Sequence, residues 1–291
     1  MFNKKINKMV LKFINKVAVI TGAGKGIGYE IARQLVNEGA SVVLNDIDEP
    51  LATSAAIQLV KEGPGKCIAV SGDASDYEVI QTIVEKAIAH YGQIDIAIAN
   101  AGNTVFGDFF DFTLEEFQKV VNLNFQGSFF LIQQAAKQMR LQGRGGRLLL
   151  MSSTIGLRAY PQLCIYSMTK AALHMMAKSL VLDLSPYNIT INAVAPGATL
   201  TERTLLEDPE YENCWRDLIP NGRTAQTNDV AKASLFLLST DASHITGQTL
   251  VIDGGWSAVS PYPNSFDSLK NNNTVASEGH ISHLKKKRSH E

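Results

Sequence analysis

The sequence predicts a single α/β domain, in which a doubly wound parallel sheet of seven strands is flanked by helices. Two observations carry this prediction. Between Lys16 and Asp253, short apolar runs alternate with longer amphipathic segments. The apolar runs also lack the polar–apolar alternation of a half-exposed sheet, which is typical of strands buried on both faces. With 291 residues the chain can form one large core, and we place the domain at residues 16–258.

Each expected strand is short and is bounded by glycine or polar residues. We expect right-handed crossovers between the parallel strands. In such open sheets ligands gather at the carboxyl ends of the strands. The expected strands are Val17–Ile20, Ser41–Asn45, Cys67–Val70, Ile94–Ala99, Arg147–Met151, Ile189–Val194 and Thr249–Ile252.

The segments between the strands carry apolar residues at helical spacing. Ile27, Ile31 and Leu35 recur in this way in the first of them. In another, Thr113 followed by Glu116 has the spacing of a capping box. The expected helices are Ile27–Glu38, Asp76–Tyr91, Thr113–Gln138, Cys164–Leu184 and Thr227–Ser239.

The region Leu200–Pro220 breaks the alternation of strands and helices. Because it follows a late strand, we favour a mobile lid over a pocket, with a surface excursion around a small local core as the alternative. Its large apolar side chains, set among many charges, are Leu205, Leu206, Tyr211, Trp215, Leu218 and Ile219.

Both ends of the chain differ from the domain between them. Residues 1–15 are rich in lysine and contain no acidic residue, so we expect a basic, solvated leader. Residues 259–291 are rich in Pro, Asn, Ser, Lys and His, and this low hydrophobicity predicts disorder. The basic run Lys285–Arg288 is either a localisation or polyanion signal or, as we favour, a solubilising feature.

Composition narrows the function classes. The net charge of −1 predicts no strong attraction to nucleic acid or to an anionic membrane. No apolar stretch approaches the ~18–20 residues that cross a bilayer. The three cysteines are far apart, so a cytoplasmic location is the default expectation. We expect no metal, because no group of His, Cys, Asp and Glu has ligand spacing.

The first expected strand runs into the glycine-rich turn Thr21–Gly28. Glycines let the backbone approach a pyrophosphate, and a helix N-terminus offers free N–H groups to it. The pattern is Thr-Gly-x-x-x-Gly-x-Gly, with Gly22, Gly26 and Gly28 as its glycines. A glycine turn without a ligand is the alternative, which the strand–turn–helix context disfavours.

The cofactor expected in this turn is NAD. Asp46 ends the second strand, where a carboxylate can accept hydrogen bonds from the ribose hydroxyls and repel a 2′-phosphate. Lys25 in the glycine turn favours NADP, but we give Asp46 more weight because its position directly opposes that phosphate. A carboxylate that caps a helix before Pro50 is the other interpretation of Asp46.

Tyr166 and Lys170 have the spacing of neighbours on one helix face. An ammonium close to a phenol lowers the pKa of the phenol and tunes it for proton exchange near neutral pH. Ser153 lies thirteen residues before Tyr166. The alternatives are two surface residues for the Tyr–Lys pair and a turn-capping hydroxyl for Ser153, a role that Ser152 could also take.

Together these residues resemble the short-chain dehydrogenase/reductase family over roughly residues 16–257. Asn100-Ala101-Gly102 resembles the family's Asn-Ala-Gly, although Ala99 stands where another Asn is usual. Asp73 resembles the family's aspartate after the third strand, although Ala74 follows it where Val is common. Asp253-Gly254-Gly255 resembles the family's closing turn. The implied cofactor contacts are Gly22, Lys25, Gly26, Ile27, Gly28, Asp46, Asp73, Ala74, Asn100, Ala101, Gly102, Tyr166, Lys170, Pro196, Gly197 and Thr201.

The resemblance implies a Rossmann domain that transfers a hydride between NAD(H) and a secondary alcohol or ketone. Tyr166 would be the acid–base group, and Ser153 would bind the substrate oxygen. Lys170 would lower the pKa of Tyr166 and bind the nicotinamide ribose, and Asn124 would hold a water that links Lys170 to solvent.

The substrate class is open at this point. Ile219-Pro220 and the glycine turn look similar to glucose and hydroxysteroid dehydrogenases, so we expect a sugar, polyol or hydroxysteroid-like substrate. The alternatives are a 3-oxoacyl-thioester reductase, which Asp46 disfavours, and a non-catalytic NAD(H)-binding regulatory protein. The family's usual dimer surfaces imply a homotetramer.

Overall fold

The central sheet of the chain has seven parallel strands in the order β3-β2-β1-β4-β5-β6-β9, which confirms the fold class expected from the sequence. The computed structural model describes residues 11–259. The strands of this sheet are β1 (Val17–Ile20), β2 (Ser41–Asp46), β3 (Lys66–Ser71), β4 (Ile96–Ala99), β5 (Gly146–Met151), β6 (Ile189–Pro196) and β9 (Thr249–Ile252).

The strand boundaries agree closely with those expected. The largest differences are at β4, which begins at Ile96, and at β6, which continues through Pro196. Before β4, the Asp95 carboxylate accepts a 2.9 Å hydrogen bond from the Val17 amide, so a side chain there replaces part of the regular ladder. At the end of β6, Pro196 still pairs with Ile252.

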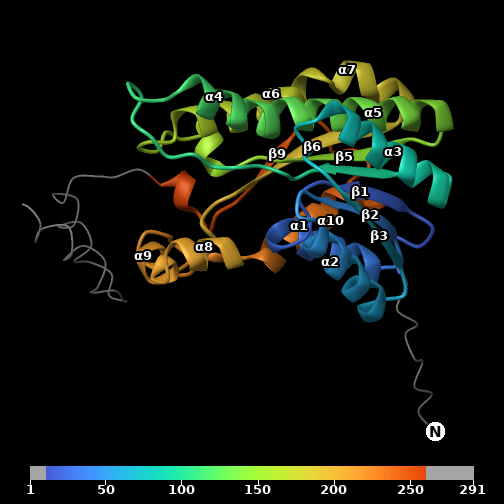
Figure 1. Cartoon of the computed structure of the whole chain (residues 1–291), viewed down its shortest axis with the longest axis horizontal. Coiled ribbons are helices and arrows are strands. Elements are labelled where there is room, and N and C mark those ends of the chain that lie inside the picture. The colour runs from blue at the N-terminus through green and yellow to red at the C-terminus, as the bar shows by residue number, and fades with distance from the viewer. Residues whose placement is uncertain (1–10, 260–291) are drawn as a thin grey trace, which may run out of the picture.

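Helices cover both faces of the sheet, as Figure 1 shows. Successive residues of β1 alternate between two apolar cores: Val17 and Val19 join the core under α3, α5 and α6, whereas Ala18 and Ile20 join the core under α1, α2 and α10. The helices are α1 (Gly26–Asn37), α2 (Glu49–Glu62), α3 (Tyr77–Tyr91), α4 (Leu114–Val121), α5 (Ser128–Gln142), α6 (Cys164–Ser179), α7 (Val181–Leu184), α8 (Glu202–Glu207), α9 (Tyr211–Arg216) and α10 (Thr227–Leu238).

Helix α2 was not expected from the sequence. It buries Ala52, Ala55, Ala56 and Leu59, and Asp48 caps its first turn by accepting a 2.9 Å hydrogen bond from the Leu51 amide. Three alanines give this face a weak hydrophobic signal, and the proline in the first turn obscures the start of the helix.

The expected helix Thr113–Gln138 is one helical run with a change of geometry inside it. The capping box of Thr113 and Glu116 is present at its start. Between α4 and α5, Asn122–Gly127 forms a π-helix. A Cβ on Gly127 would collide with the carbonyl oxygen of Ala74, so this glycine lets the wide turn pack against the loop after β3.

The end of the expected leader is part of the folded domain. Phe13 is 2% exposed and packs in the core beside α1. Its amide donates a 3.0 Å hydrogen bond to the carbonyl oxygen of Glu38, so residues 11–15 depart from the solvated leader that the sequence predicted. Residues 1–10 of the leader, the expected disorder of the tail and the basic run Lys285–Arg288 lie outside the described residues.

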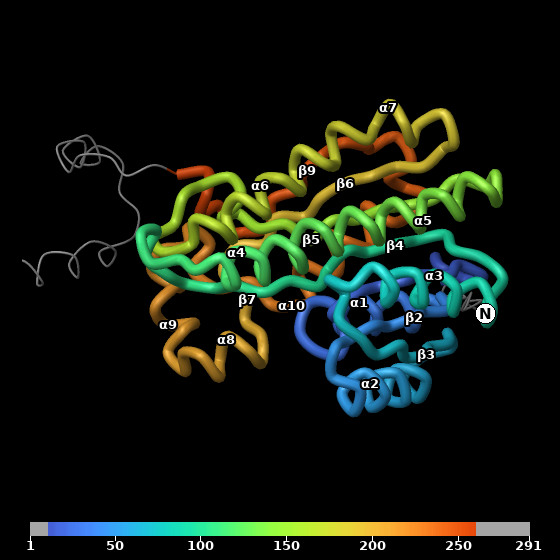
Figure 2. The backbone as a smooth tube through the Cα atoms, turned by 45° about the horizontal axis from the view of Figure 1, so that its top comes forward, coloured from blue at the N-terminus to red at the C-terminus, as the bar shows by residue number. Residues whose placement is uncertain are grey.

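The region expected to be a lid contains α8 and α9, and a short two-stranded sheet of β7 (Thr199–Leu200) and β8 (Ala225–Gln226) flanks it. In Figures 1 and 2 these two helices stand apart from the helix layers, at one end of the sheet. Separate helices therefore stand where the alternation breaks, and their movement as a lid stays a prediction. Within residues 11–259, no helix has the length and apolar character needed to span a bilayer.

The order of the strands reverses beside β1. The chain runs outward from β1 through β2 to β3 and then crosses to β4 on the other side of β1. The connections after β1 and β4 therefore leave in opposite directions, which opens a crevice at the carboxyl ends of these strands.

Candidate active site

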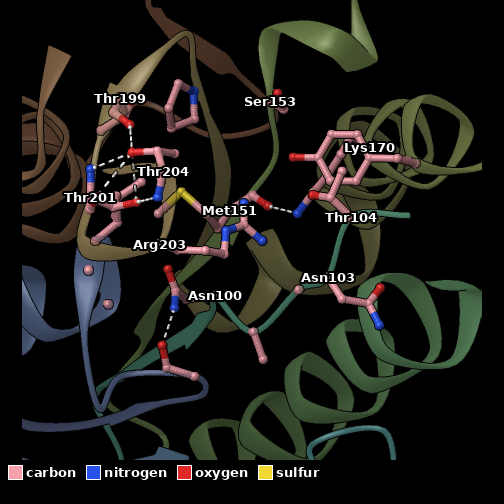
Figure 3. Close-up of a pocket in the computed structure, with 18 of the residues that line it drawn as sticks. Asn100, Asn103, Thr104, Met151, Ser153, Lys170, Thr199, Thr201, Arg203 and Thr204 are labelled. Carbon is pink, nitrogen blue, oxygen red and sulfur yellow. Dashed lines mark hydrogen bonds between the residues drawn. The ribbon is translucent and has the colours of Figure 1, made fainter. Parts of the chain in front are cut away.

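A cleft of about 870 Å³ opens at the carboxyl ends of the strands. Figure 3 shows side chains from the ends of β4 and β5, from α6 and from the α8 region converging on it. Its volume lies toward the upper end of the range for small-molecule sites.

Asn100 fixes the glycine turn at one side of the cleft. Its side-chain amide donates hydrogen bonds to the carbonyl oxygens of Thr21, at 2.9 Å, and Gly22, at 2.8 Å. A Cβ on Gly28 would lie 2.5 Å from the same amide nitrogen. Gly22 and Gly26 have φ values of 61° and 64°, which other residues rarely adopt. The turn is thus shaped before any ligand binds.

The first turn of α1 fits the pyrophosphate of a dinucleotide. Lys25 is the N-cap residue, and within residues 11–259 no side chain caps this helix. Gly26 is not crowded, because a Cβ on this residue would lie 3.9 Å from its nearest neighbours, side-chain atoms of Glu202 and Thr201. Backbone N–H groups at an uncapped helix start attract an anion. The exposed Lys25 side chain adds positive charge at the rim.

Asp46 faces the glycine turn from the end of β2. One carboxylate oxygen accepts a 2.9 Å hydrogen bond from the Gly24 amide, and the other accepts a 3.2 Å bond from the Asp48 amide. A Cβ at Gly24 would lie 2.8 Å from the Asp46 carboxylate. The negative charge is therefore held against the cleft by the backbone rather than by a neighbouring cation. Asp48, not Asp46, caps the following helix.

Two serines follow β5, and they face different ways. Ser152 is buried: its hydroxyl donates a 2.8 Å hydrogen bond to the carbonyl oxygen of Lys170 and contacts Nε2 of His174. Ser153 lines the cleft, and its hydroxyl also accepts a 3.2 Å bond from the Ile155 amide. Ser153 therefore both caps the turn and lines the cleft, whereas the Ser152 hydroxyl makes buried contacts with Lys170 and His174.

Tyr166 and Lys170 lie one turn apart on α6, and both line the cleft. Lys170 is only 4% exposed, and its ammonium donates a 2.7 Å hydrogen bond to the carbonyl oxygen of Met151. The ammonium nitrogen lies 5.6 Å from the centre of the Tyr166 ring.

Burial dominates the electrostatics of this pair. It raises the pKa of Tyr166, against hydrogen bonding by Ser153 and Thr104 and the positive charge of Arg203. Burial and the charge of Arg203 lower the pKa of Lys170 to about 8. The expected lowering of the tyrosine pKa by Lys170 is therefore wrong for this arrangement, because the lysine is itself desolvated and turned toward β5.

Asn124 lies behind the wall of the cleft and is fully buried in the π-helix. Its oxygen accepts a 2.8 Å hydrogen bond from the Asn103 amide, and its nitrogen donates to the Asn103 carbonyl oxygen at 2.9 Å and to the Thr169 hydroxyl at 3.2 Å. A Cβ on Gly102 would lie 3.2 Å from the Asn124 oxygen and 3.3 Å from the Lys170 ammonium. Gly102 thus leaves open the space that these two polar groups face.

The far side of the cleft is built on the closing turn. A Cβ on Gly197 would lie 2.6 Å from Cβ of Asp253, so the chain after β6 packs directly on this turn. The Asp253 carboxylate accepts hydrogen bonds from the amides of Gly255, at 2.9 Å, and Ser257, at 2.7 Å. Thr201 caps α8 by accepting a 3.2 Å bond from the Thr204 amide.

The structure brings every predicted site residue except Asn124 to the lining of this one cleft. Sequence reasoning missed several others. Tyr211 and Trp215 stood in the region expected to be a lid, but nothing in the sequence gave either residue a place in the cleft lining. The lining residues that were not predicted include Asn103, Thr104, Phe106, Met151, Tyr160, Arg203, Tyr211, Trp215 and Trp256.

Several known proteins are similar to this chain over most of its length. A family model described as enoyl-(acyl carrier protein) reductase matches residues 22–257. Elsinochrome reductase 1 of Elsinoe fawcettii is 38% identical over 252 residues, which cover 82% of this chain and 93% of that protein. L-rhamnose 1-dehydrogenase (NAD(P)(+)) of Azotobacter vinelandii is 35% identical over 247 residues, which cover 83% of this chain and 96% of that protein.

A solved structure has the same fold over the same part of the chain. The 3-ketoacyl-(acyl-carrier-protein) reductase from Brucella melitensis, complexed with NADH, superposes with a TM-score of 0.78 at 33% sequence identity. The superposition covers 84% of this chain and 99% of that one. The matched range of the family model includes the whole cleft, from Gly22 to Trp256.

Proposed function

This chain belongs to the short-chain dehydrogenase/reductase family, and we propose that it is an NAD-dependent enzyme that interconverts a secondary alcohol and a ketone. The observation that carries the proposal is the meeting of Ser153, Tyr166 and Lys170 in the same cleft as the glycine turn. A cofactor bound along that turn would extend its nicotinamide toward these three side chains, because the cleft runs without interruption from one to the other.

The nicotinamide, when bound, would supply the hydride in reduction and accept it in oxidation. The residues of the chain hold the substrate oxygen and move one proton. Because burial raises the pKa of Tyr166, its phenol is protonated at neutral pH and donates to the carbonyl oxygen in reduction. In oxidation the phenol would first pass its proton through Lys170 to solvent, and the phenolate would then take the proton of the alcohol. Ser153 hydrogen-bonds the same oxygen as negative charge develops on it.

Lys170 and Asn124 would connect this proton transfer to solvent. The Lys170 ammonium nitrogen lies 5.6 Å from the centre of the Tyr166 ring. Because the pKa of Lys170 is lowered, the ammonium releases a proton more easily. Asn124 is rigidly held by Asn103 and Thr169, and its oxygen faces the same space above Gly102 as the ammonium. A water in that space would link the two groups, and Lys170 would also bind the ribose next to the nicotinamide.

Asp46 supports NAD rather than NADP as the cofactor. Its carboxylate is fixed at the end of β2 by the Gly24 amide, where the adenosine ribose of a dinucleotide would lie. A 2′-phosphate there would meet a like charge. The NADH in the Brucella structure is consistent with this preference.

For the substrate we propose a secondary alcohol or ketone of the sugar, polyol or hydroxysteroid type, and the rhamnose dehydrogenase relative supports a sugar. A 3-oxoacyl-thioester reductase is the second candidate, because the Brucella relative bears that name. A non-catalytic NAD(H)-binding protein is disfavoured by the presence of all four residues of the proton path.

Two exposed apolar surfaces support a homotetramer. On one face, Phe117 of α4 is 43% exposed, and Met168 and Met175 of α6 are 56% and 59% exposed. At the sheet edge, Leu250 and Val251 of β9 are 38% and 37% exposed. Two distinct surfaces of this kind would join four chains in two steps. Light scattering of the purified protein should give the mass of four chains, and a monomer mass would contradict this. We also propose a cytoplasmic location.

The activity is tested by following NADH absorbance with a panel of sugars, polyols, hydroxysteroids, cyclic ketones and 3-oxoacyl thioesters. Each substrate is assayed with NAD(H) and with NADP(H), beside the Tyr166→Phe variant. We expect Tyr166-dependent turnover with NAD(H). If no substrate turns over although NADH binds, the enzyme proposal is wrong and the regulatory alternative gains support.

A further inference from the structure

We propose that the preferred substrate is a planar, multi-ring carbonyl compound, such as a fused aromatic ketone or quinone. The inference rests on the proposed interconversion of an alcohol and a ketone, and it replaces the sugar, polyol or hydroxysteroid type with a flat aromatic substrate. It is carried by four aromatic side chains that line the cleft, Tyr160, Tyr211, Trp215 and Trp256, which we call the aromatic wall.

Trp215 is the centre of the aromatic wall. Its ring is stacked on Tyr160 with 6.1 Å between centroids and an interplanar angle of 25°. The Tyr211 ring is 6.1 Å away and tilted by 46°, and the Trp256 ring is 5.7 Å away and edge-on at 73°. The rings therefore meet one another through faces and edges, which are the arrangements that aromatic rings prefer, and together they line one side of the cleft.

The wall is assembled from three separate parts of the chain. Tyr160 precedes α6, Tyr211 and Trp215 lie on α9, and Trp256 follows β9. These contacts attach α9 to the domain. Attachment alone does not explain why the aromatic side chains are exposed, because Tyr160 is 37% exposed and, among the described residues, none on α9 is buried. Aromatic side chains that only hold elements together are normally buried.

The wall is held in place before a substrate binds. The Arg158 side chain donates hydrogen bonds to the carbonyl oxygens of Val259, at 2.8 Å, and Trp256, at 3.3 Å. Its guanidinium carbon lies 5.9 Å from the centre of the Trp256 ring, within the range of a cation–π contact. A preformed surface of this kind loses little side-chain freedom when a flat ligand stacks on it.

The wall and the catalytic phenol belong to one site. Tyr166, Arg203 and all four rings line the same cleft. Burial raises the pKa of Tyr211 to about 12, so this ring stays neutral at physiological pH. A ring system stacked on the wall would thus hold its carbonyl group near Tyr166. The cleft also holds polar side chains such as Asn103, Thr104 and Arg203, so the preference for an aromatic ring rests on the wall itself.

The reaction balances as an ordinary carbonyl reduction. The carbonyl carbon gains a hydride from the reduced nicotinamide, and the C=O π bond opens as the oxygen gains the proton of Tyr166. The products are the secondary alcohol and the oxidised nicotinamide, and one proton from solvent restores the tyrosine. A quinone carbonyl is reduced to the hydroquinone level by the same transfer of a hydride and a proton, with one further proton exchange.

The first experiment compares 2-tetralone with 2-decalone, two bicyclic ketones of the same carbon skeleton that differ in one aromatic ring. We expect the wild-type protein to reduce 2-tetralone with NADH at a kcat/KM at least tenfold higher. Trp215→Leu should remove most of this preference through KM, and Trp215→Phe should keep it. Phe236→Leu is the matched control, because Phe236 lies on α10 outside the cleft and is 46% exposed.

The second experiment measures binding without turnover. Trp215 and Trp256 are the only tryptophans of the chain, and both line the cleft, so intrinsic tryptophan emission reports on the wall. In the Tyr166→Phe variant saturated with NADH, 2-tetralone should quench this emission at lower concentration than 2-decalone.

The outcomes separate the two proposals. Tyr166-dependent reduction of 2-decalone or a sugar as efficiently as 2-tetralone would overturn the aromatic substrate and leave the proposed function intact. Stronger binding of 2-tetralone without reduction of any ketone would support the wall and overturn the enzymatic function. Neither binding nor reduction would overturn both.

Discussion

The Lys170 ammonium donates a 2.7 Å hydrogen bond to the carbonyl oxygen of Met151, the last residue of β5. This bond ties a buried cation of α6 to the end of the central sheet. It holds the cation in a buried position, and this burial makes its charge costly in the folded state. The pKa of Lys170 is lowered to about 8 by burial and by the charge of Arg203.

Replacing Lys170 should reveal this cost as a pH-dependent stability difference. The folded pKa of about 8 lies below the ordinary value of 10.5. The unfolded chain therefore binds more protons between these values, and stability from this group rises with pH across that window. Lys170→Met should be more stable than the wild type at pH 7, by on the order of 2–4 kcal/mol, and the difference should shrink toward pH 10.

Urea unfolding of both proteins at about pH 7 and pH 9.5 checks this. An equal difference at the two pH values would show that the lysine keeps its ordinary pKa. Turnover should fall in Lys170→Met at both pH values, because the proton path to Tyr166 loses its cation.

Asp46→Asn should shift cofactor preference toward NADP. The substitution keeps the shape of the side chain but removes the charge that opposes a 2′-phosphate, so the ratio of kcat/KM for NADPH to that for NADH should rise at least tenfold, or about 1.4 kcal/mol. The control is Asp48→Asn, which removes a charge two residues away from Asp46. Asp48 caps α2, and its replacement should leave the ratio unchanged. Equal ratios in the wild type and Asp46→Asn would refute the discrimination argument.

Gly28→Ala should damage the cofactor end of the cleft. The added Cβ would lie 2.5 Å from the Asn100 amide and 2.6 Å from the Gly22 carbonyl oxygen. The clash should raise the KM for NADH at least tenfold and destabilise the protein by roughly 1–3 kcal/mol. In the control Gly92→Ala, nothing lies within 4 Å of the Cβ but φ is 76°. That variant should lose stability without a change in the KM for NADH.

The segment before β1 should contribute to stability. Phe13 is 2% exposed, whereas its neighbour Ile14 is 58% exposed. Phe13→Ala should lower the free energy of unfolding by about 3–5 kcal/mol through lost burial and a cavity. Ile14→Ala should change it by less than about 0.5 kcal/mol. Similar effects of the two substitutions in thermal or urea unfolding would argue that the segment is not attached in solution.

The sheet was predictable because strands buried on both faces leave short uninterrupted apolar runs. The glycine turn and the Tyr166–Lys170 pair were predictable because their chemistry depends on residues close together in sequence. Helix α2 was not, since Ala52 and Ala55 give little hydrophobic contrast. The π-helix that holds Asn124 has no sequence signal, because the wide turn is set by packing against the loop that contains Ala74.

The aromatic wall could not be predicted from the sequence, for a different reason. Tyr160, Trp215 and Trp256 are far apart in the chain, and only the fold brings their rings within 5.7–6.1 Å of one another through Trp215. The direction of the Tyr166 pKa was mispredicted because spacing on a helix places Lys170 nearby but does not show that its ammonium turns to Met151. Side-chain burial and orientation, rather than element type, set that electrostatic outcome.

The measurement that tests the central claim most directly is NADH-linked turnover of wild type and Tyr166→Phe at equal NADH occupancy. Removal of the phenolic proton should lower kcat by roughly 100- to 10,000-fold while the Kd for NADH stays within about twofold of wild type. A Tyr166→Phe variant that turns over at the wild-type rate would contradict the assignment of Tyr166 as the acid–base group.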